Sequence, residues 1–183
     1  MSNQYGFTTN IHDLLITKKP SFCHQKLELF EEWKYKEVCE EQHYYNASVP
    51  LNQVVGTYHP NYANQTWIDL LPARFKSEKN IPDFSEKNNF ERMKNGEANA
   101  YEFCKNPKYY FSDEKKENWG FYKFGKKFYI EDGNHRTVIA KFFLNLNNLP
   151  EVVNGVSVTE FIPKKSSSFN LIEHFFKGKV NNS

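Results

Sequence analysis

Seven consecutive residues in the second half of the chain collect side chains that can hold an anion and move a proton. They are Glu131, Asp132, Gly133, Asn134, His135, Arg136 and Thr137. An arginine guanidinium can bind two phosphate oxygens at once, and a histidine can exchange a proton near neutral pH. The carboxylate of Asp132 can hold a metal ion, accept a hydrogen bond from a ribose hydroxyl or brace Arg136. These residue types predict chemistry on phosphate groups.

The flanking residues predict a strand before this segment and a helix after it. Phe128, Tyr129 and Ile130 are aromatic or β-branched, as strand residues often are. After Gly133, apolar residues recur with helical period at Val138, Ile139, Phe142, Phe143 and Leu146. A glycine permits a sharp turn with positive φ. Because the first N–H groups of a helix lack intrahelical acceptors and lie at the positive end of its dipole, the turn is expected to bind a phosphate.

The same spacing has a simpler interpretation. Asp132 can merely cap the helix, and Arg136 can pair with Glu131 or Asp132. Capping turns of this kind are common, so residue spacing alone leaves both interpretations open.

Residues 128–140, which read Phe-Tyr-Ile-Glu-Asp-Gly-Asn-His-Arg-Thr-Val-Ile-Ala, resemble the signature of the ParB/sulfiredoxin superfamily. In that superfamily a Gly-x-x-Arg or Gly-x-His-Arg turn links a hairpin strand to a helix and cradles nucleotide phosphates. Residues 49–56 are similar to the first strand and turn of the domain, and residues 156–161 fit its following strand. The resemblance spans 48–162 in pieces, and the segment 77–116 matches poorly.

The resemblance implies a role for each residue of the turn. The nucleotide, ATP or CTP, is expected to contact Gly133, Asn134, Arg136 and Thr137. His135 is expected to act as acid or base, and Arg136 to stabilise charge in the transition state. Asp132, together with Glu131, is expected to hold Mg²⁺.

The family's members imply two classes of function. Nucleases, nucleotide hydrolases and plasmid-borne inhibitors of DNA transfer point to metal-assisted cleavage of a phosphoanhydride or of a DNA phosphodiester. The alternative is a regulatory module, in which a bound nucleotide gates a protein-binding surface made by the last helix. A toxin that modifies a host protein with a nucleotide is a third, weaker possibility.

This chain departs from the family pattern at two points, and each departure argues against one class of family member. Sulfiredoxins place a reactive cysteine directly before the His-Arg pair, whereas this chain has Asn134 there, which argues against sulfinic acid reduction. Chromosome-partitioning ParB proteins continue into a helix-turn-helix and a dimerisation region, and the 21 residues that follow Ile162 leave no room for either. We therefore expect a stand-alone domain.

Length and composition agree with a single cytoplasmic domain. The 183 residues suit one domain, and a formal net charge of +2 is far from that of a strongly basic nucleic-acid-binding domain. Three cysteines cannot form a closed disulfide framework. The chain shows neither a signal peptide nor a run of about 18 apolar residues, so we expect no membrane partner.

The pattern along the chain predicts an α+β domain with a mixed sheet, a small ParB/sulfiredoxin-like fold. We divide it into an N-terminal helical extension (1–47), the core (48–162) and a C-terminal amphipathic helix (163–183). Apolar spacing predicts helices at 25–42, at 66–75, from Ser85 onward with an interruption at Gly96, and from Ser168 onward. Strands are expected at 48–55 with a turn at Gly56, in a hairpin of 120–124 and 127–130, and at 156–161.

Other polar residues allow several interpretations. A zinc site could draw on Cys23, His24, Cys39 and His43, although no Cys-x-x-Cys pair supports it. His59 could face the phosphate turn or lie exposed in a loop. Lysines 123, 126 and 127 could extend the site toward DNA or could simply be solvated. Arg74 could reach the ligand.

Overall fold

The computed structural model describes residues 6–76 and 94–164. Within them, six strands form one mixed sheet in the order β1-β3-β5-β4-β6-β2. The strands are β1 (Glu28–Leu29), β2 (Cys39–Pro50), β3 (Val54–Thr57), β4 (Gly120–Phe124), β5 (Lys127–Asp132) and β6 (Val152–Pro163). The helices are α1 (Ile11–Thr17), α2 (Trp33–Lys36), α3 (Trp67–Leu70), α4 (Lys94–Lys105) and α5 (Asn134–Leu146). Short 3-10 turns are η1 (Leu51–Gln53), η2 (Ala73–Phe75) and η3 (Pro107–Tyr110).

The sheet combines both kinds of strand pairing. β1 with β3, β3 with β5, and β4 with β6 are parallel, whereas β4 with β5 and β2 with β6 are antiparallel. Together with the helices this arrangement confirms the predicted α+β class with a mixed sheet.

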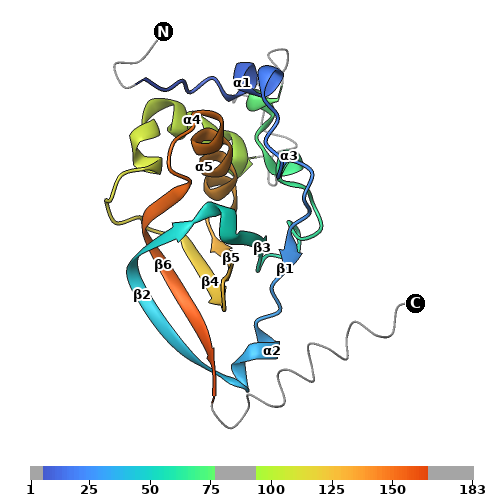
Figure 1. Ribbon diagram of the computed structural model, residues 1–183, viewed down its shortest axis with the longest axis vertical. Helices are drawn as coiled ribbons and strands as arrows, with labels where there is room; N and C mark the ends of the chain where they lie inside the picture. Colours follow the sequence, from blue (N-terminus) through green and yellow to red (C-terminus); the bar gives the residue numbers. More distant parts are fainter. Residues whose placement is uncertain (1–5, 77–93, 165–183) are drawn as a thin grey trace, which may run out of the picture.

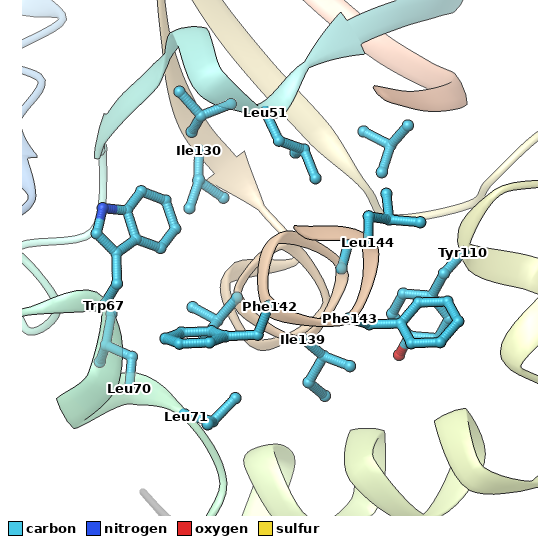
Figure 2. Packing of buried hydrophobic residues seen from close by; sticks show 14 of the residues in the cluster. Leu51, Trp67, Leu70, Leu71, Tyr110, Ile130, Ile139, Phe142, Phe143 and Leu144 are labelled. Carbon is cyan, nitrogen blue, oxygen red and sulfur yellow. The ribbon is translucent and has the colours of Figure 1, made fainter. Parts of the chain in front are cut away.

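Helix α5 is the centre of the main core. Its residues from Thr137 to Leu144 are all buried, as expected of a helix covered on every side. Figure 1 shows α4 and α5 side by side on one face of the sheet, with α1 near them. Figure 2 shows the ring of Phe143 against Tyr110 and the ring of Phe142 on the side of Trp67. The rings of Phe143 and Phe103 meet edge to face at 4.9 Å, which fixes α4 against α5.

The other face of the sheet carries a smaller core of mostly aromatic residues. It consists of Phe30, Tyr35, Cys39, Tyr122, Tyr129 and Phe161. Phe30 stacks between Tyr35 at 4.8 Å and Tyr122 at 5.1 Å. The chain between β1 and β2 therefore covers this face with rings rather than with a full helix.

The local predictions around the turn at Gly133 are confirmed. β4 and β5 form the expected hairpin, closed by Gly125-Lys126, and α5 begins at Asn134 and ends before Asn147. The predicted strand at 156–161 is the central part of β6. The short helical piece at 66–75 is present as α3 and η2.

The prediction of a helix at 25–42 was wrong. This stretch contains β1, the single turn α2 and the start of β2. Its apolar residues serve two separate cores: Leu27 lies in the main core, whereas Phe30 and Tyr35 lie in the smaller one. Pairing of β2 with β6, more than a hundred residues later in the chain, outweighs local helical spacing. The predicted N-terminal helical extension thus contributes β1 and most of β2, the two edge strands.

Several further expectations differ from the structure or lie outside it. The single strand predicted at 48–55 is divided among the end of β2, η1 and the start of β3. Gly56 is in β3 rather than in a turn, because its missing side chain lets the backbone of Glu28 approach closely. Gly96 lies within α4 instead of interrupting it. The start of the helix predicted from Ser85 and the whole helix predicted from Ser168 lie outside the described residues. Among the helices that are described, none is long and apolar enough to span a membrane.

Candidate phosphate-binding site

The turn between β5 and α5 depends on the absence of a side chain at Gly133. Its φ of 81° is in the left-handed region, which glycine adopts without steric cost. A Cβ at this position would lie 2.8 Å from Cδ1 of Trp119. Both the backbone conformation and the packing therefore require glycine, and the predicted positive φ is confirmed.

Trp119 fixes the first turn of α5. Its indole Nε1–H donates to Oγ1 of Thr137 at 2.9 Å, and Thr137 Oγ1 donates to the carbonyl of Gly133 at 3.0 Å. The guanidinium of Arg136 lies over the indole, 5.4 Å from the ring centre. Tyr109 and Tyr110 pack against the other sides of the indole. One buried ring thus positions three residues of the turn.

The start of α5 is open toward solvent. Gly133 at its N-cap provides no side-chain cap. Among the described residues, no acceptor pairs with the backbone N–H of Asn134, His135 or Arg136. Asp132 Oδ1 instead accepts from the N–H of Gly133 at 2.6 Å, one residue before the helix. The helix end therefore keeps the donors and the positive dipole end that an anion can use.

Arg136 is held by main-chain oxygens rather than by an acid. One terminal nitrogen donates to the carbonyl of Glu117 at 2.9 Å and the other to the carbonyl of Asn118. Neither Glu131 nor Asp132 forms an ion pair with it. The sequence interpretation in which Arg136 pairs with one of these acids is therefore wrong. A guanidinium has further N–H donors, and among the described residues neither an acceptor for these donors nor an acid paired with the charge is found.

The carboxyl ends of the parallel strands β3 and β5 bring a second loop to the turn. Thr57, the last residue of β3, pairs in register with Ile130. Its Oγ1 donates to Oδ1 of Asn134 at 2.8 Å and accepts from the N–H of His59 at 3.0 Å. A buried threonine therefore ties the loop of His59 to the first residue of α5, at the kind of sheet edge where ligands bind in α/β proteins.

His135 is largely enclosed. Its Nε2 lies 3.2 Å from the hydroxyl of Tyr62, and its Nδ1 is buried without a hydrogen-bond partner among the described residues. Gly96 of α4 packs against that nitrogen: a Cβ there would lie 3.2 Å from it. Burial lowers the pKa of His135, although the nearby Leu70 backbone and the Glu97 carboxylate oppose the shift. The imidazole is therefore neutral near pH 7.

Two hollows meet at this histidine. The first, of about 380 Å³, lies over the turn and is lined by His59, Tyr62, Asn99, Asn118, Asp132, Gly133, Asn134, His135 and Arg136. The second, of about 540 Å³, shares His59, Tyr62 and His135 with the first. In the second hollow Glu97, 2% exposed, pairs with Nε of Arg74 at 3.0 Å. Arg74 thus neutralises a buried carboxylate beside the site.

Five of the seven residues predicted from the sequence line the first hollow, and two do not. Thr137 is fully buried behind the turn, where it binds Trp119 and Gly133 rather than a ligand. Glu131 lies on the opposite face of the sheet, beside Tyr122, and burial raises its pKa. Because successive strand residues point to opposite faces, Glu131 and Asp132 do not converge. Among the described residues, no cluster of three potential ligands could hold a metal ion.

The remaining candidates from the sequence are also dispersed. Cys23 and Cys39 belong to different cores, and the three cysteines are free. Lys123 pairs with Glu160 and Lys127 with Glu28, which leaves Lys126 as the hairpin lysine without an ion pair in the described part of the chain. His59 is exposed and yet lines both hollows, so both interpretations of it hold.

Sequence reasoning missed the residues that hold the turn. Trp119, Thr57 and Tyr62 carry no motif, and only their pairing across strands and loops brings them to α5. Comparisons with protein-family models, with curated proteins and with solved structures give no match to this chain. Its function is therefore inferred from the geometry of the site.

Replacing Gly133 by alanine should destabilise the chain by about 3 kcal/mol, from left-handed strain plus displacement of Trp119. Gly125→Ala is the matched control, because Gly125 also has positive φ (58°) but open space around its Cβ position. It should cost only about 1 kcal/mol. Urea unfolding of both variants measures the difference, and equal losses would contradict the proposed packing against Trp119.

The lowered pKa of His135 predicts a loss of stability in acid. Below about pH 6.5 the unfolded chain takes up a proton at this residue while the folded chain does not, so stability falls as the pH drops through that range. In the His135→Gln variant, stability should therefore decrease less as the pH is lowered. Urea unfolding midpoints measured from about pH 8 to about pH 5 give this dependence. His43→Gln, which removes an exposed histidine on β2, is the matched control. Parallel slopes in all three proteins would refute a buried neutral His135.

Proposed function

We propose that this chain binds the phosphates of a nucleotide at the turn between β5 and α5, as a ParB/sulfiredoxin-like domain. The observation that carries the proposal is the uncapped start of the 13-residue helix α5, which opens into the hollow beside Arg136. Free backbone donors, a dipole end and a guanidinium at one place form a site for a multiply charged anion.

The arrangement of Arg136 supports this function in energetic terms. Its guanidinium is already oriented by two carbonyls and by the Trp119 ring, so little side-chain entropy remains to be lost when an anion binds. No ion pair has to break first. The hollow of about 380 Å³ is in the range of small-molecule sites and can hold a nucleotide's phosphates together with part of the sugar.

Catalysis is the further step of the proposal. Mg²⁺ in nucleotide sites is usually bound by one or two carboxylates together with substrate phosphates and water, so the single carboxylate of Asp132 at the hollow suits it. Bound there, the metal would neutralise phosphate charge and so favour cleavage of a phosphoanhydride of ATP or CTP, or of a DNA phosphodiester. Asn134 and Gly133 would contribute backbone donors, and Arg136 would stabilise the developing charge.

A nucleotide-gated binding module is the second candidate, and the geometry of His135 favours it. Nε2 of this residue contacts Tyr62 and Nδ1 is buried, so neither nitrogen can reach a ligand unless the Tyr62 side chain moves. If Tyr62 stays in place, His135 acts as a packing residue and supplies no acid or base for turnover.

Arg136→Ala should abolish nucleotide binding while the fold stays intact, because charged hydrogen bonds to phosphate contribute about 1.5–3 kcal/mol each. Isothermal titration with ATP and with CTP, each with and without Mg²⁺, measures the effect, and circular dichroism checks the fold. Lys126→Ala, which removes an exposed cation on the hairpin turn, should leave affinity nearly unchanged. A folded Arg136→Ala protein with wild-type nucleotide affinity would contradict phosphate binding at this turn.

Asp132→Asn separates the enzyme from the binding module. If Asp132 holds Mg²⁺, the variant should lose metal-dependent phosphate release and bind the metal-free nucleotide as well as or better than wild type, because a bare carboxylate repels phosphates. Phosphate release and plasmid cleavage are measured with Mg²⁺ and with a chelator. Metal dependence equal to that of wild type would leave the binding module as the better description.

A further inference from the structure

Lys141 is an unexpected residue in the middle of α5. It is the one charged side chain among the buried residues of that helix and is 3% exposed. It lies about two turns beyond the phosphate-binding turn. None of the residues that line the first hollow surrounds it.

The amine of Lys141 has an aromatic and uncharged environment. It donates to the carbonyl of Leu51 in η1, and it lies 4.8 Å from the ring centre of Phe22 and 4.7 Å from that of Trp67. Figure 2 shows Leu51 and Trp67 beside α5. No carboxylate of the described residues is within ion-pair distance. Burial lowers the pKa of Lys141 to about 8, and Glu151 opposes this shift only in part.

Core packing does not require an amine at this position. A buried ammonium without an ion pair is unfavourable, and one carbonyl and two rings compensate for it only partly. Methionine or leucine would fill the same space without that penalty. Reactivity therefore explains an amine at this position better than packing does.

A cavity gives that amine access to small molecules. It has a volume of about 460 Å³, and Lys141 forms part of its wall, opposite the chain segment 21–28. Asn145, one turn further along α5, and Glu151 also line it and share a hydrogen bond of 2.8 Å. Oδ1 of Asn145 is buried and makes no hydrogen bond among the described residues. The lining of the cavity thus combines an amine, a carboxylate and an amide whose buried oxygen has no partner among the described residues.

We propose that Lys141 captures a small aldehyde or ketone in this cavity as an imine. The lone pair of the neutral amine forms a bond from Nζ to the carbonyl carbon, the nitrogen loses its protons, and the carbonyl oxygen leaves as water. Glu151, in the same wall, is the group placed to carry a proton between nitrogen and oxygen. Carboxylic acids, which form no imine, are not captured.

Propanal with sodium cyanoborohydride tests the proposal on the full chain, because the hydride reduces an imine to a stable secondary amine. Peptide mass spectrometry compares labelling of Lys141 with that of Lys126 in the exposed hairpin turn. Lys141 should label at least about tenfold faster than Lys126 at near-neutral pH. A pKa of about 8 leaves roughly a hundredfold more of its amine neutral than the usual lysine pKa near 10.4 would, and burial offsets part of this gain by limiting access. With cyanoborohydride in excess, so that addition of the neutral amine limits the rate, labelling of Lys141 should speed up as the pH rises toward about 8.

Two variants define the site. Glu151→Gln should slow labelling of Lys141 without changing that of Lys126, and Lys141→Arg should remove the fast phase. The labelling rates of Lys141 and Lys126 in the wild-type chain test the proposal even if the Lys141→Arg variant fails to fold. If Lys141 labels more slowly than Lys126, it is a structural donor to Leu51 and the proposal is wrong. Nucleotide binding at Arg136 is independent of either result.

Discussion

The contact between the Trp119 indole and the bare backbone of Gly133 is the constraint on which the candidate site depends. The indole occupies the space in which any other residue would carry its Cβ, and it donates to the hydroxyl of Thr137. The chain must therefore leave β5 and enter α5 in one conformation. That conformation leaves the first N–H groups of α5 uncapped, and it places the guanidinium of Arg136 over the same ring. The exposed donors of the candidate site are thus a consequence of packing.

The burial of α5 makes that conformation rigid. A helix whose middle is covered by the sheet, by α4 and by aromatic rings cannot shift without opening the core, because protein interiors are packed at crystal-like density. Thr57 extends the same rigidity to the neighbouring loop, since its hydroxyl joins His59 to Asn134. Both sides of the hollow are therefore preorganised by residues that a ligand need not touch.

Local signals in the sequence were sufficient for the hairpin, for the left-handed glycine and for the helix after it, because each depends on residues within one or two turns. Long-range pairing explains the failures. Residues 25–42 have apolar spacing that suits a helix, but β2 pairs with β6 and the rings of Phe30 and Tyr35 cover a separate face. Trp119 and Tyr62 reach the turn only through the fold, so no local pattern could identify them.

The charges around the hollow determine which ligands it favours. Arg136 and the helix dipole are positive, His135 is neutral because partial burial lowers its pKa, and Asp132 is the one acid of the described lining. An anion that binds here adds negative charge near His135 and so favours its protonated form, which burial opposes. Affinity for a bare anion should then strengthen as His135 takes up a proton. A divalent cation beside Asp132 would weaken that coupling, because it supplies the positive charge that the histidine otherwise provides. If the hollow binds phosphate as proposed, the balance between Asp132 and His135 would therefore determine whether a bare phosphate or its metal complex is favoured.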